Sequence, residues 1–234
     1  MPIYRLPREF FFPSPEDAEP SGLLAIGGGL EPQRLVLAYS QGIFPWYSEG
    51  QPILWFSPDP RFVLYPEEFH MSRSLKKRIK KRDFIVTFDQ DFSSVIKQCS
   101  KVPRPGQSGT WITDDMIDAY EKLHQLGIAH SVEVYLDKVL VGGLYGICLG
   151  NMYFGESMFA LVSDASKVGF SYLVRQLECW GIEMIDSQVH TEHLERFGAR
   201  HIKRSEYLSV VHNLVGKQRV RKKWSFDEGF FPLK

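Results

Sequence analysis

The sequence contains few cysteines. Cys99, Cys148 and Cys179 are the three cysteines among 234 residues, and they lie far apart, with no CxxC pair and no Cys/His set at the spacing of metal ligands. An odd and scattered set argues against both a disulfide framework and a structural zinc site. The cysteine content therefore indicates a reducing compartment, and we expect a cytoplasmic location.

Long apolar runs are absent as well. No uninterrupted apolar stretch reaches the length that spans a bilayer, and the N-terminal stretch MPIYRLPREF has early charges and prolines rather than the apolar core of a signal peptide. We therefore expect neither export nor association with a membrane.

The chain also lacks net charge, because 28 Lys and Arg residues balance 28 Asp and Glu residues. Such a chain has no global field that attracts nucleic acid. Any binding to a polyanion must therefore come from basic residues that cluster locally.

The common motifs for cofactors and nucleophiles are missing. The glycine-rich stretch GLLAIGGGLEP has neither the GxGxxG nor the GxxxxGKS/T form, so nucleotide binding there is not expected. Ser157 lies in GESMF rather than in a GxSxG elbow. His190 and His193 lack the carboxylate or cysteine pattern of a metal site.

The residues that are present divide the chain into two regions. Residues 1–65 are rich in proline, glycine and aromatic residues, with one short helix predicted around Leu35, Val36 and Tyr39. Residues 66–234 alternate between helical and strand patterns around a meander of antiparallel strands. We expect an α+β fold, with a small, loop-rich N-terminal domain (1–65) and a larger domain (66–234) that contains a mixed sheet.

Residues 71–82 form a basic segment in which Met71, Leu75 and Ile79 recur at helical spacing. This narrow apolar stripe leaves most of the helix surface to basic side chains. The basic residues are Arg73, Lys76, Lys77, Arg78, Lys80, Lys81 and Arg82, with no acid among them. The simpler interpretation is a solvent-exposed helix face, but such a face usually has acidic residues among the basic ones. The pattern therefore favours polyanion binding. A second basic set near the chain end is weaker evidence and comprises Arg219, Arg221, Lys222 and Lys223.

Two predicted strands carry polar residues in apolar surroundings. Glu156 lies in GESMF, where it is either a perturbed carboxylate that needs a partner or an edge residue that faces water. In GIEMIDSQVH, residues 181–190, strand alternation places Met184, Asp186 and Gln188 on one face. Asp186 and Gln188 then form either a satisfied buried pair or part of a site beside an apolar pocket.

An ordered set of motifs resembles the leucyl/phenylalanyl-tRNA–protein transferase family. The motifs are GGL, GIFPW and ILWFSPDPR, then GTWIT, MIDAY, GGLYG, GESMF, ASK and IDSQV, in order between about residues 13 and 210. Each motif alone is weak, but the ordered set is specific. The resemblance implies that residues 66–234 have the acetyltransferase-like (GNAT) fold. It also implies the transfer of Leu, Phe or sometimes Met from aminoacyl-tRNA to the N-terminal Arg or Lys of a protein, which marks that protein for the bacterial N-end rule pathway.

The resemblance further implies a set of site residues. The pocket for the aminoacyl side chain would comprise Leu144, Tyr153, Met158, Phe170, Leu177 and Cys179. The aromatic residues around the aminoacyl-adenosine end would be Trp46, Trp111 and Tyr120. Glu156 and Asp186 would form the acidic site for the acceptor, with Gln188 completing the catalytic set, and the basic helix would bind tRNA phosphates.

The implied reaction fits the missing motifs. The donor is already activated as an ester, so an enzyme of this kind needs no cofactor, metal or covalent nucleophile. We expect Gln188 to accept a hydrogen bond from the attacking amine and Asp186 to hold Gln188 in its productive rotamer. The expected partners are leucyl-tRNA, phenylalanyl-tRNA and acceptor proteins with N-terminal Arg or Lys, and we expect a monomer.

Two alternatives stay open from the sequence. An acyl-CoA N-acyltransferase would share the fold, but SDASKVGFSY does not supply the R/QxxGxG/A loop that usually binds pyrophosphate in that group. A non-catalytic RNA-binding module would use residues 71–82, but it would leave Glu156, Asp186 and Gln188 unexplained.

Overall fold

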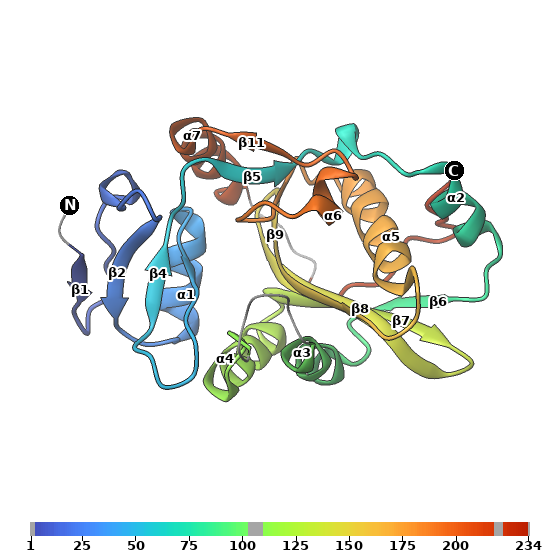
Figure 1. The fold of residues 1–234 in the computed structure, drawn as a ribbon, viewed down its shortest axis with the longest axis horizontal. Helices are drawn as coiled ribbons and strands as arrows, with labels where there is room; N and C mark the ends of the chain where they lie inside the picture. The colour runs from blue at the N-terminus through green and yellow to red at the C-terminus, as the bar shows by residue number, and fades with distance from the viewer. Residues whose placement is uncertain (1–2, 103–109, 218–221, 234) are drawn as a thin grey trace.

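Two β-sheets organise the chain (Figure 1). The structure is a computed structural model that describes residues 3–102, 110–217 and 222–233. The smaller sheet has the strand order β1-β2-β4-β3, and the larger sheet has the order β11-β5-β10-β9-β8-β7-β6. The strands span β1 Tyr4–Leu6, β2 Leu23–Gly27, β3 Phe44–Pro45, β4 Leu54–Phe56, β5 Arg61–Leu64, β6 Ile85–Phe88, β7 Ala129–Leu136, β8 Val139–Leu149, β9 Met152–Ala160, β10 Met184–Asp186 and β11 Arg200–Ile202.

The helices cover both faces of the larger sheet. They span α1 Pro32–Ser40, α2 Arg73–Lys80, α3 Phe92–Lys101, α4 Asp114–Gln125, α5 Ala165–Cys179, α6 Glu192–Glu195 and α7 Arg204–Val215. Helices α3 and α4 pack on one face, and α5 packs on the other face with α2 beside it. Helix α1 contacts β3, α4 and α7, so it lies between the two sheets.

The larger sheet is mixed, as the sequence predicts. Strands β9 and β10 run parallel, and each of the other neighbouring pairs in this sheet is antiparallel. Strands β7, β8 and β9 form the predicted meander. The α+β prediction is therefore confirmed by the topology.

Local capping contacts define the ends of several helices. The Ser72 hydroxyl accepts a hydrogen bond from the Leu75 N–H at the start of α2, and the Thr113 hydroxyl accepts one from the Met116 N–H at the start of α4. Gly127 follows α4 with φ 72°, which glycine adopts without a steric penalty.

The loop-rich N-terminal region contains a sheet that the sequence analysis did not predict. It forms a four-stranded sheet from strands of only a few residues each, which are too short for a periodic pattern to reveal. Strand β5, Arg61–Leu64, falls before the predicted boundary at residue 65 but pairs with β10 and β11 in the larger sheet. The chain therefore enters the larger sheet a few residues earlier than the composition indicates.

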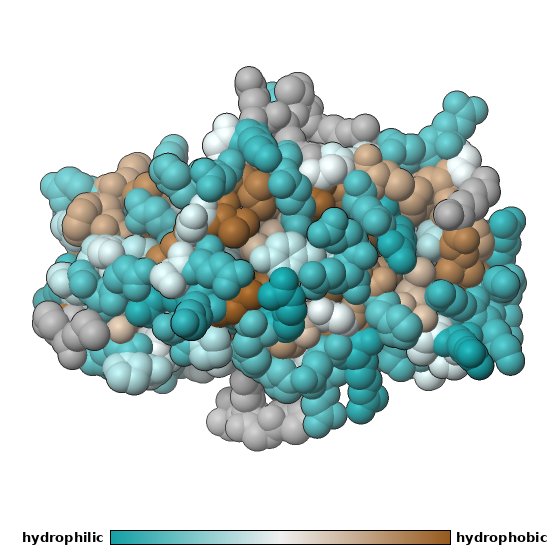
Figure 2. All heavy atoms as spheres, turned by 90° about the horizontal axis from the view of Figure 1, so that it is seen from above, coloured by the Kyte–Doolittle hydropathy of each residue, from teal (hydrophilic) through white to brown (hydrophobic). Residues whose placement is uncertain are grey.

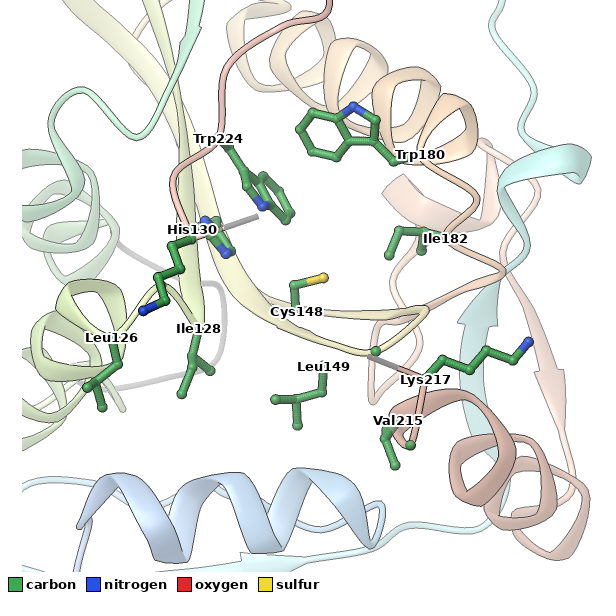
Figure 3. Close-up of a pocket in the computed structure, with 14 residues that line it drawn as sticks. Leu126, Ile128, His130, Cys148, Leu149, Trp180, Ile182, Val215, Lys217 and Trp224 are labelled. Atoms are coloured by element: carbon green, nitrogen blue, oxygen red, sulfur yellow. The ribbon is translucent and has the colours of Figure 1, made fainter. Parts of the chain in front are cut away.

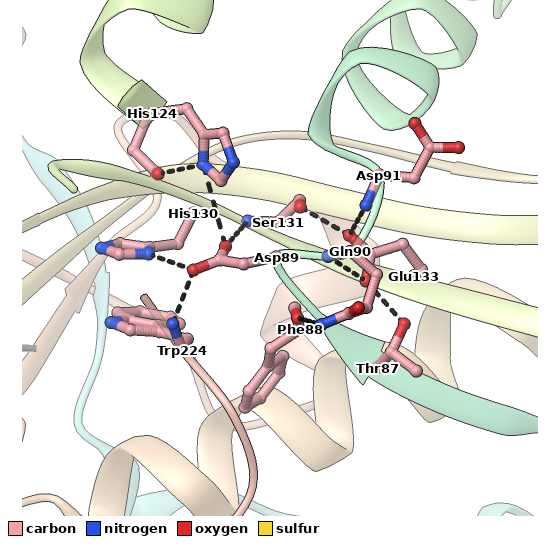
Figure 4. Close-up of polar contacts among 11 residues, drawn as sticks. Thr87, Phe88, Asp89, Gln90, Asp91, His124, His130, Ser131, Glu133 and Trp224 are labelled. Atoms are coloured by element: carbon pink, nitrogen blue, oxygen red, sulfur yellow. Dashed lines mark hydrogen bonds and ion pairs between the residues drawn. The ribbon is translucent and has the colours of Figure 1, made fainter. Parts of the chain in front are cut away.

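Buried carboxylates fix the corner where β6 meets β7 (Figure 4). Asp89 accepts hydrogen bonds from the main-chain N–H groups of Ser131 at 2.9 Å and Trp224 at 2.7 Å, and Nδ1 of His130 lies 2.8 Å from the same carboxylate. Glu133 accepts a hydrogen bond from the Ser131 hydroxyl at 2.6 Å, and burial raises the pKa of Glu133. These contacts attach the C-terminal segment to the larger sheet.

The surface seen from the side of β5, β11 and α7 is mostly hydrophilic, with hydrophobic residues visible in small groups between charged ones (Figure 2). Within the described part of the chain, no helix combines the length and the apolar character that crossing a membrane requires.

Candidate functional site

A pocket of about 710 Å³ opens where two parallel strands diverge. Pairing between β9 and β10 ends at Phe154 and Asp186, but β9 continues to Ala160. Gly155, Glu156, Ser157 and Met158 of β9 line one side of the pocket, and residues 187–191 line the other. We call this cavity the wedge pocket.

The other walls of the wedge pocket are aromatic and apolar. Trp46, next to β3, and Trp111, just before α4, both line it. The apolar lining comes from β8, β9, β10, α5 and α6 and comprises Leu144, Tyr153, Met158, Phe170, Ile185 and Leu194. A concave, largely apolar cavity with a few polar groups is typical of a small-molecule or substrate site.

Glu156 owes its orientation to a β-bulge. Tyr145 pairs with Ser157 and Gly146 pairs with Gly155, so Glu156 has no register partner on β8. A bulge of this kind turns a side chain away from the regular alternation. The carboxylate of Glu156 therefore reaches both the pocket and the helices behind it.

Two buried tyrosines hold the Glu156 carboxylate. The Tyr39 hydroxyl donates to Oε1 at 2.7 Å, and the Tyr120 hydroxyl donates to Oε2 at 3.0 Å. Burial raises the pKa of Glu156 to about 7, although the two phenol hydrogen bonds favour the ionised form. Among the carboxylates that the structure describes, only Glu156 lines the wedge pocket.

Asp186 lies behind the pocket wall and is fully buried. Arg61 donates to both of its oxygens, from Nε at 2.8 Å and from Nη2 at 2.7 Å, and the Tyr207 hydroxyl donates to Oδ2 at 2.7 Å. Both oxygens of the Asp186 carboxylate are bonded to protein groups, and Asp186 is not part of the pocket lining. The structure does not bring Asp186 into the pocket lining, where the resemblance would place it to bind the acceptor cation, and Glu156 is the carboxylate that lines the pocket.

Gln188 does not belong to the strand that the sequence predicts. Strand β10 ends at Asp186, and Gln188 has φ 56°, a left-handed conformation that side-chain-bearing residues seldom adopt. The Val189 N–H bonds to the Ser187 carbonyl at 2.6 Å, so Gln188 is the central residue of a γ-turn. The turn breaks the alternation: Ile185, Ser187 and Gln188 line the wedge pocket, whereas Met184 is buried in the core and Asp186 lies behind the wall.

The contact between Asp186 and Gln188 also differs from its prediction. Asp186 Oδ1 accepts a hydrogen bond from the main-chain N–H of Gln188 at 2.9 Å, rather than bonding to its carboxamide. The Gln188 Nε2 atom is buried and has no hydrogen-bond partner among the described residues. Asp186 thus holds the main chain of Gln188 and makes no contact that would fix the Gln188 side-chain rotamer.

Three further predicted site residues do not line the wedge pocket. Tyr120 is completely buried, so its ring has no free face on which a nucleobase could stack. Leu177 belongs to α5 and is buried in the core, and Cys179 is exposed at the end of that helix. Neither residue lines the wedge pocket. Helix α5 contributes Ser166 and Phe170, from its first turns, to the lining. Of the six residues that the resemblance assigns to the aminoacyl pocket, Leu144, Tyr153, Met158 and Phe170 line this cavity. Their role in binding the aminoacyl group stays a prediction.

The basic helix lies far from the small sheet, at the opposite end of the molecule (Figure 1). Leu75 and Ile79 are buried as predicted, and the basic residues Arg73, Lys76, Lys77, Lys80, Lys81 and Arg82 are exposed. Arg78 is different, because it pairs with Asp83 and lies over the Phe84 ring at 4.0 Å. Of the second basic set, Arg219 and Arg221 lie outside the described residues.

Apart from Tyr120, the side chains that bond to the two carboxylates are not among the predicted site residues. Tyr39 comes from α1, Arg61 from β5 and Tyr207 from α7, and all three are fully buried. Arg61 could have been found from the sequence, because it begins the otherwise apolar run RFVLY. An arginine in a buried strand requires an anionic partner. Tyr39 and Tyr207 look like ordinary core residues in the sequence.

A second cavity of about 550 Å³ lies between the β8–β9 turn and the C-terminal segment (Figure 3). His130 and Trp224 line it with their rings stacked at 3.9 Å, and Nδ1 of His130 lies against Asp89. Lys217 at its rim donates to Glu183 at 2.7 Å. Because His130 Nδ1 and Lys217 already have protein partners and no described carboxylate lines it, this cavity is a weaker candidate than the wedge pocket. Across the described ranges, no group of His, Cys, Asp or Glu side chains is arranged to hold a metal ion.

The chain is distantly similar to a solved acetyltransferase structure. A GCN5-related N-acetyltransferase from Kribbella flavida matches with a TM-score of 0.36 and 9% identity, over 73% of this chain and 60% of that chain. Similarity at this level carries no argument about the site.

Comparison of sequences is decisive. A protein of Anaeromyxobacter sp. (strain Fw109-5) called leucyl/phenylalanyl-tRNA–protein transferase is 53% identical over 232 residues, which are 99% of each chain. A protein of Myxococcus xanthus (strain DK1622) with the same name is 53% identical over 96% of this chain and 97% of its own length. The sequence model for leucyl/phenylalanyl-tRNA protein transferase matches residues 63–212, and the model for the N-terminal domain of that family matches residues 28–59. This chain belongs to the leucyl/phenylalanyl-tRNA–protein transferase family.

Proposed function

We propose that this enzyme transfers Leu or Phe, and less efficiently Met, from aminoacyl-tRNA to the N-terminal Arg or Lys of acceptor proteins. The observation that carries the proposal is the composition of the wedge pocket. One cavity combines two tryptophans, an apolar lobe, one carboxylate and a carboxamide held in a γ-turn. The tryptophans suit the adenosine of the donor, and the apolar lobe suits its aminoacyl side chain. The carboxylate and the carboxamide suit the cationic side chain and the α-amine of the acceptor.

The donor would occupy the aromatic and apolar walls. The terminal adenosine of the tRNA would stack on Trp46 or Trp111, which is worth roughly 1–3 kcal/mol for each stacked base. The Leu or Phe side chain would enter the lobe that Leu144, Met158 and Phe170 line. A lobe of this kind accepts apolar side chains of similar volume.

The acceptor would place its cationic side chain near Glu156 and its α-amine near Gln188. The amine nitrogen attacks the ester carbonyl, a C–N bond forms, and the bond from the carbonyl carbon to the ribose oxygen breaks. Gln188 would accept a hydrogen bond from the amine and direct its lone pair at the carbonyl, and the released proton would go to the leaving ribose oxygen. Because the ester is activated, positioning of the two substrates supplies most of the rate enhancement.

Binding of the rest of the tRNA would use the exposed residues of α2, whose charges attract phosphates without base specificity. We further propose that the reaction occurs in the cytoplasm, on a monomeric enzyme, and that the added residue makes its acceptor a substrate of the bacterial N-end rule pathway.

One assay tests the proposal. The enzyme is incubated with leucyl-tRNA and with peptides that begin with Arg, Lys or Ala but are otherwise identical. We expect leucine on the Arg and Lys peptides and none on the Ala peptide, and acetyl-CoA should not replace leucyl-tRNA as donor. No transfer to the Arg peptide, or equal transfer to all three, would overturn the proposed function.

A further inference from the structure

Asp186 is the centre of a buried hydrogen-bond network. Its carboxylate accepts four hydrogen bonds, two from Arg61, one from the Tyr207 hydroxyl and one from the Gln188 N–H. The donors come from β5, from α7 and from the turn after β10, and both members of the ion pair are completely buried. A fully satisfied buried network of this kind fixes the geometry of its members.

Arg61 connects this network to the small sheet. Its Nη1 donates to the carbonyl of Gly42 at 3.1 Å, and its guanidinium lies 4.7 Å from the Phe44 ring and 4.5 Å from the Tyr207 ring. Phe44 and the neighbouring Trp46 line the wedge pocket. One side chain therefore joins the aromatic wall of the pocket to the carboxylate behind Gln188.

The main chain of Gln188 is held on both sides. Its N–H donates to Asp186, and its carbonyl accepts from the Phe62 N–H at 3.3 Å. A left-handed conformation at a glutamine is unfavourable and persists only where its surroundings impose it. Asp186 can impose it because Arg61 and Tyr207 leave its carboxylate only one orientation.

We propose that Arg61 and Tyr207 are positioning residues that act through Asp186 to hold Gln188 in the γ-turn. The proposal rests on the proposed function, in which Gln188 directs the acceptor amine. Neither Arg61 nor Tyr207 is part of the wedge-pocket lining, so each acts without touching a substrate.

Tyr207→Phe is the most direct test, because it removes one hydroxyl and keeps the ring that packs on Arg61. We expect kcat for leucine transfer to the Arg peptide to fall about tenfold, the effect of losing one hydrogen bond to a charged group. The KM values for leucyl-tRNA and for the peptide should stay within about twofold. The matched control is Tyr4→Phe, whose hydroxyl donates to Asp17 at 3.1 Å in the small sheet and whose loss should leave kcat unchanged.

A double-mutant cycle separates positioning from general loosening of the structure. In a Gln188→Ala background, residual transfer from bound substrates should be the same with Tyr207 or Phe at position 207, because the residue that is positioned has gone. Effects that multiply in the double variant, or a kcat for Tyr207→Phe equal to wild type, would overturn the inference. Arg61→Lys keeps the charge but loses the bidentate hydrogen bond to Asp186, so it should lower kcat more than Tyr207→Phe. Transfer by the wild-type enzyme in the same assay reports on the proposed function separately.

Discussion

At the scale of single residues, Glu156 is the carboxylate that meets the pocket. The bulge on β9 turns it out of the strand alternation, and the hydroxyls of Tyr39 and Tyr120 each bond to one of its oxygens. Its protonation state is balanced near neutral pH, because burial raises the pKa of Glu156 to about 7. A cation beside it would favour the ionised form.

Replacing Glu156 by Gln keeps the shape of the side chain and removes its charge. We expect kcat/KM for the Arg peptide to fall on the order of tenfold or more, because the cationic side chain loses its partner in a partly buried site. Filter binding should show unchanged affinity for leucyl-tRNA. The control Glu183→Gln, at a surface carboxylate that pairs with Lys217, should leave both quantities at the wild-type level.

The pH dependence of transfer follows from the same residue. With the pKa of Glu156 at about 7, the carboxyl group is mostly protonated at pH 6 and mostly ionised at pH 8. We expect kcat/KM for the Arg peptide to rise with pH through this range. In Glu156→Gln the part of the rise that centres near pH 7 should vanish, while the rise due to deprotonation of the acceptor α-amine, whose ordinary pKa is roughly 7.7–8.0, should remain. An identical profile in both enzymes would contradict the assignment.

We expect Asp186 to stabilise the fold through its ion pair with Arg61. In Asp186→Ala the Arg61 guanidinium stays buried without its counter-ion, which costs about 3–5 kcal/mol of unfolding free energy. Denaturant titration of the wild type and the variant measures this loss. A variant as stable as the wild type would show that Arg61 finds another partner or water, which would contradict the closed network described above.

At the scale of elements, the sequence predicts helices better than the end of the key strand. Leu75 and Ile79, which recur at helical spacing in the sequence, are the buried residues of α2. Caps at Ser72 and Thr113 and the glycine at Gly127 mark helix ends through local chemistry. The alternation in GIEMIDSQVH predicts one face for Met184, Asp186 and Gln188, but the strand stops at Asp186. The γ-turn at Gln188 depends on a carboxylate fixed from β5 and α7, which no local pattern can reveal.

The basic helix α2 is an element whose role can be tested alone. Changing Lys76, Lys77 and Lys80 to Glu reverses charge on its exposed face, and we expect weaker binding of leucyl-tRNA together with a smaller dependence of that binding on salt. The KM of the Arg peptide should not change. Lys138→Glu, in the exposed β7–β8 turn, is the control, and equal effects of both changes would show that α2 has no special part in tRNA binding.

At the scale of the whole molecule, the pocket is assembled from distant parts of the chain. The ion pair between Arg61 and Asp186 joins residues 125 positions apart, and Tyr39 and Glu156 are 117 positions apart. The resemblance named both carboxylates and Gln188, and the structure places Glu156 and Gln188 in the pocket lining and Asp186 behind it. It could not distinguish the carboxylate that faces the pocket from the one that holds the wall, because that difference depends on tertiary contacts.

The central claim is that this pocket joins an aminoacyl group to the α-amine of an N-terminal cationic residue. The most direct measurement is tandem mass spectrometry of an Arg-initiated peptide after incubation with the enzyme and leucyl-tRNA, alongside the same peptide with an acetylated N-terminus. The account predicts one added leucine, located before the Arg, in the free peptide and none in the acetylated peptide. An unmodified free peptide, or leucine attached at any other position, would contradict it.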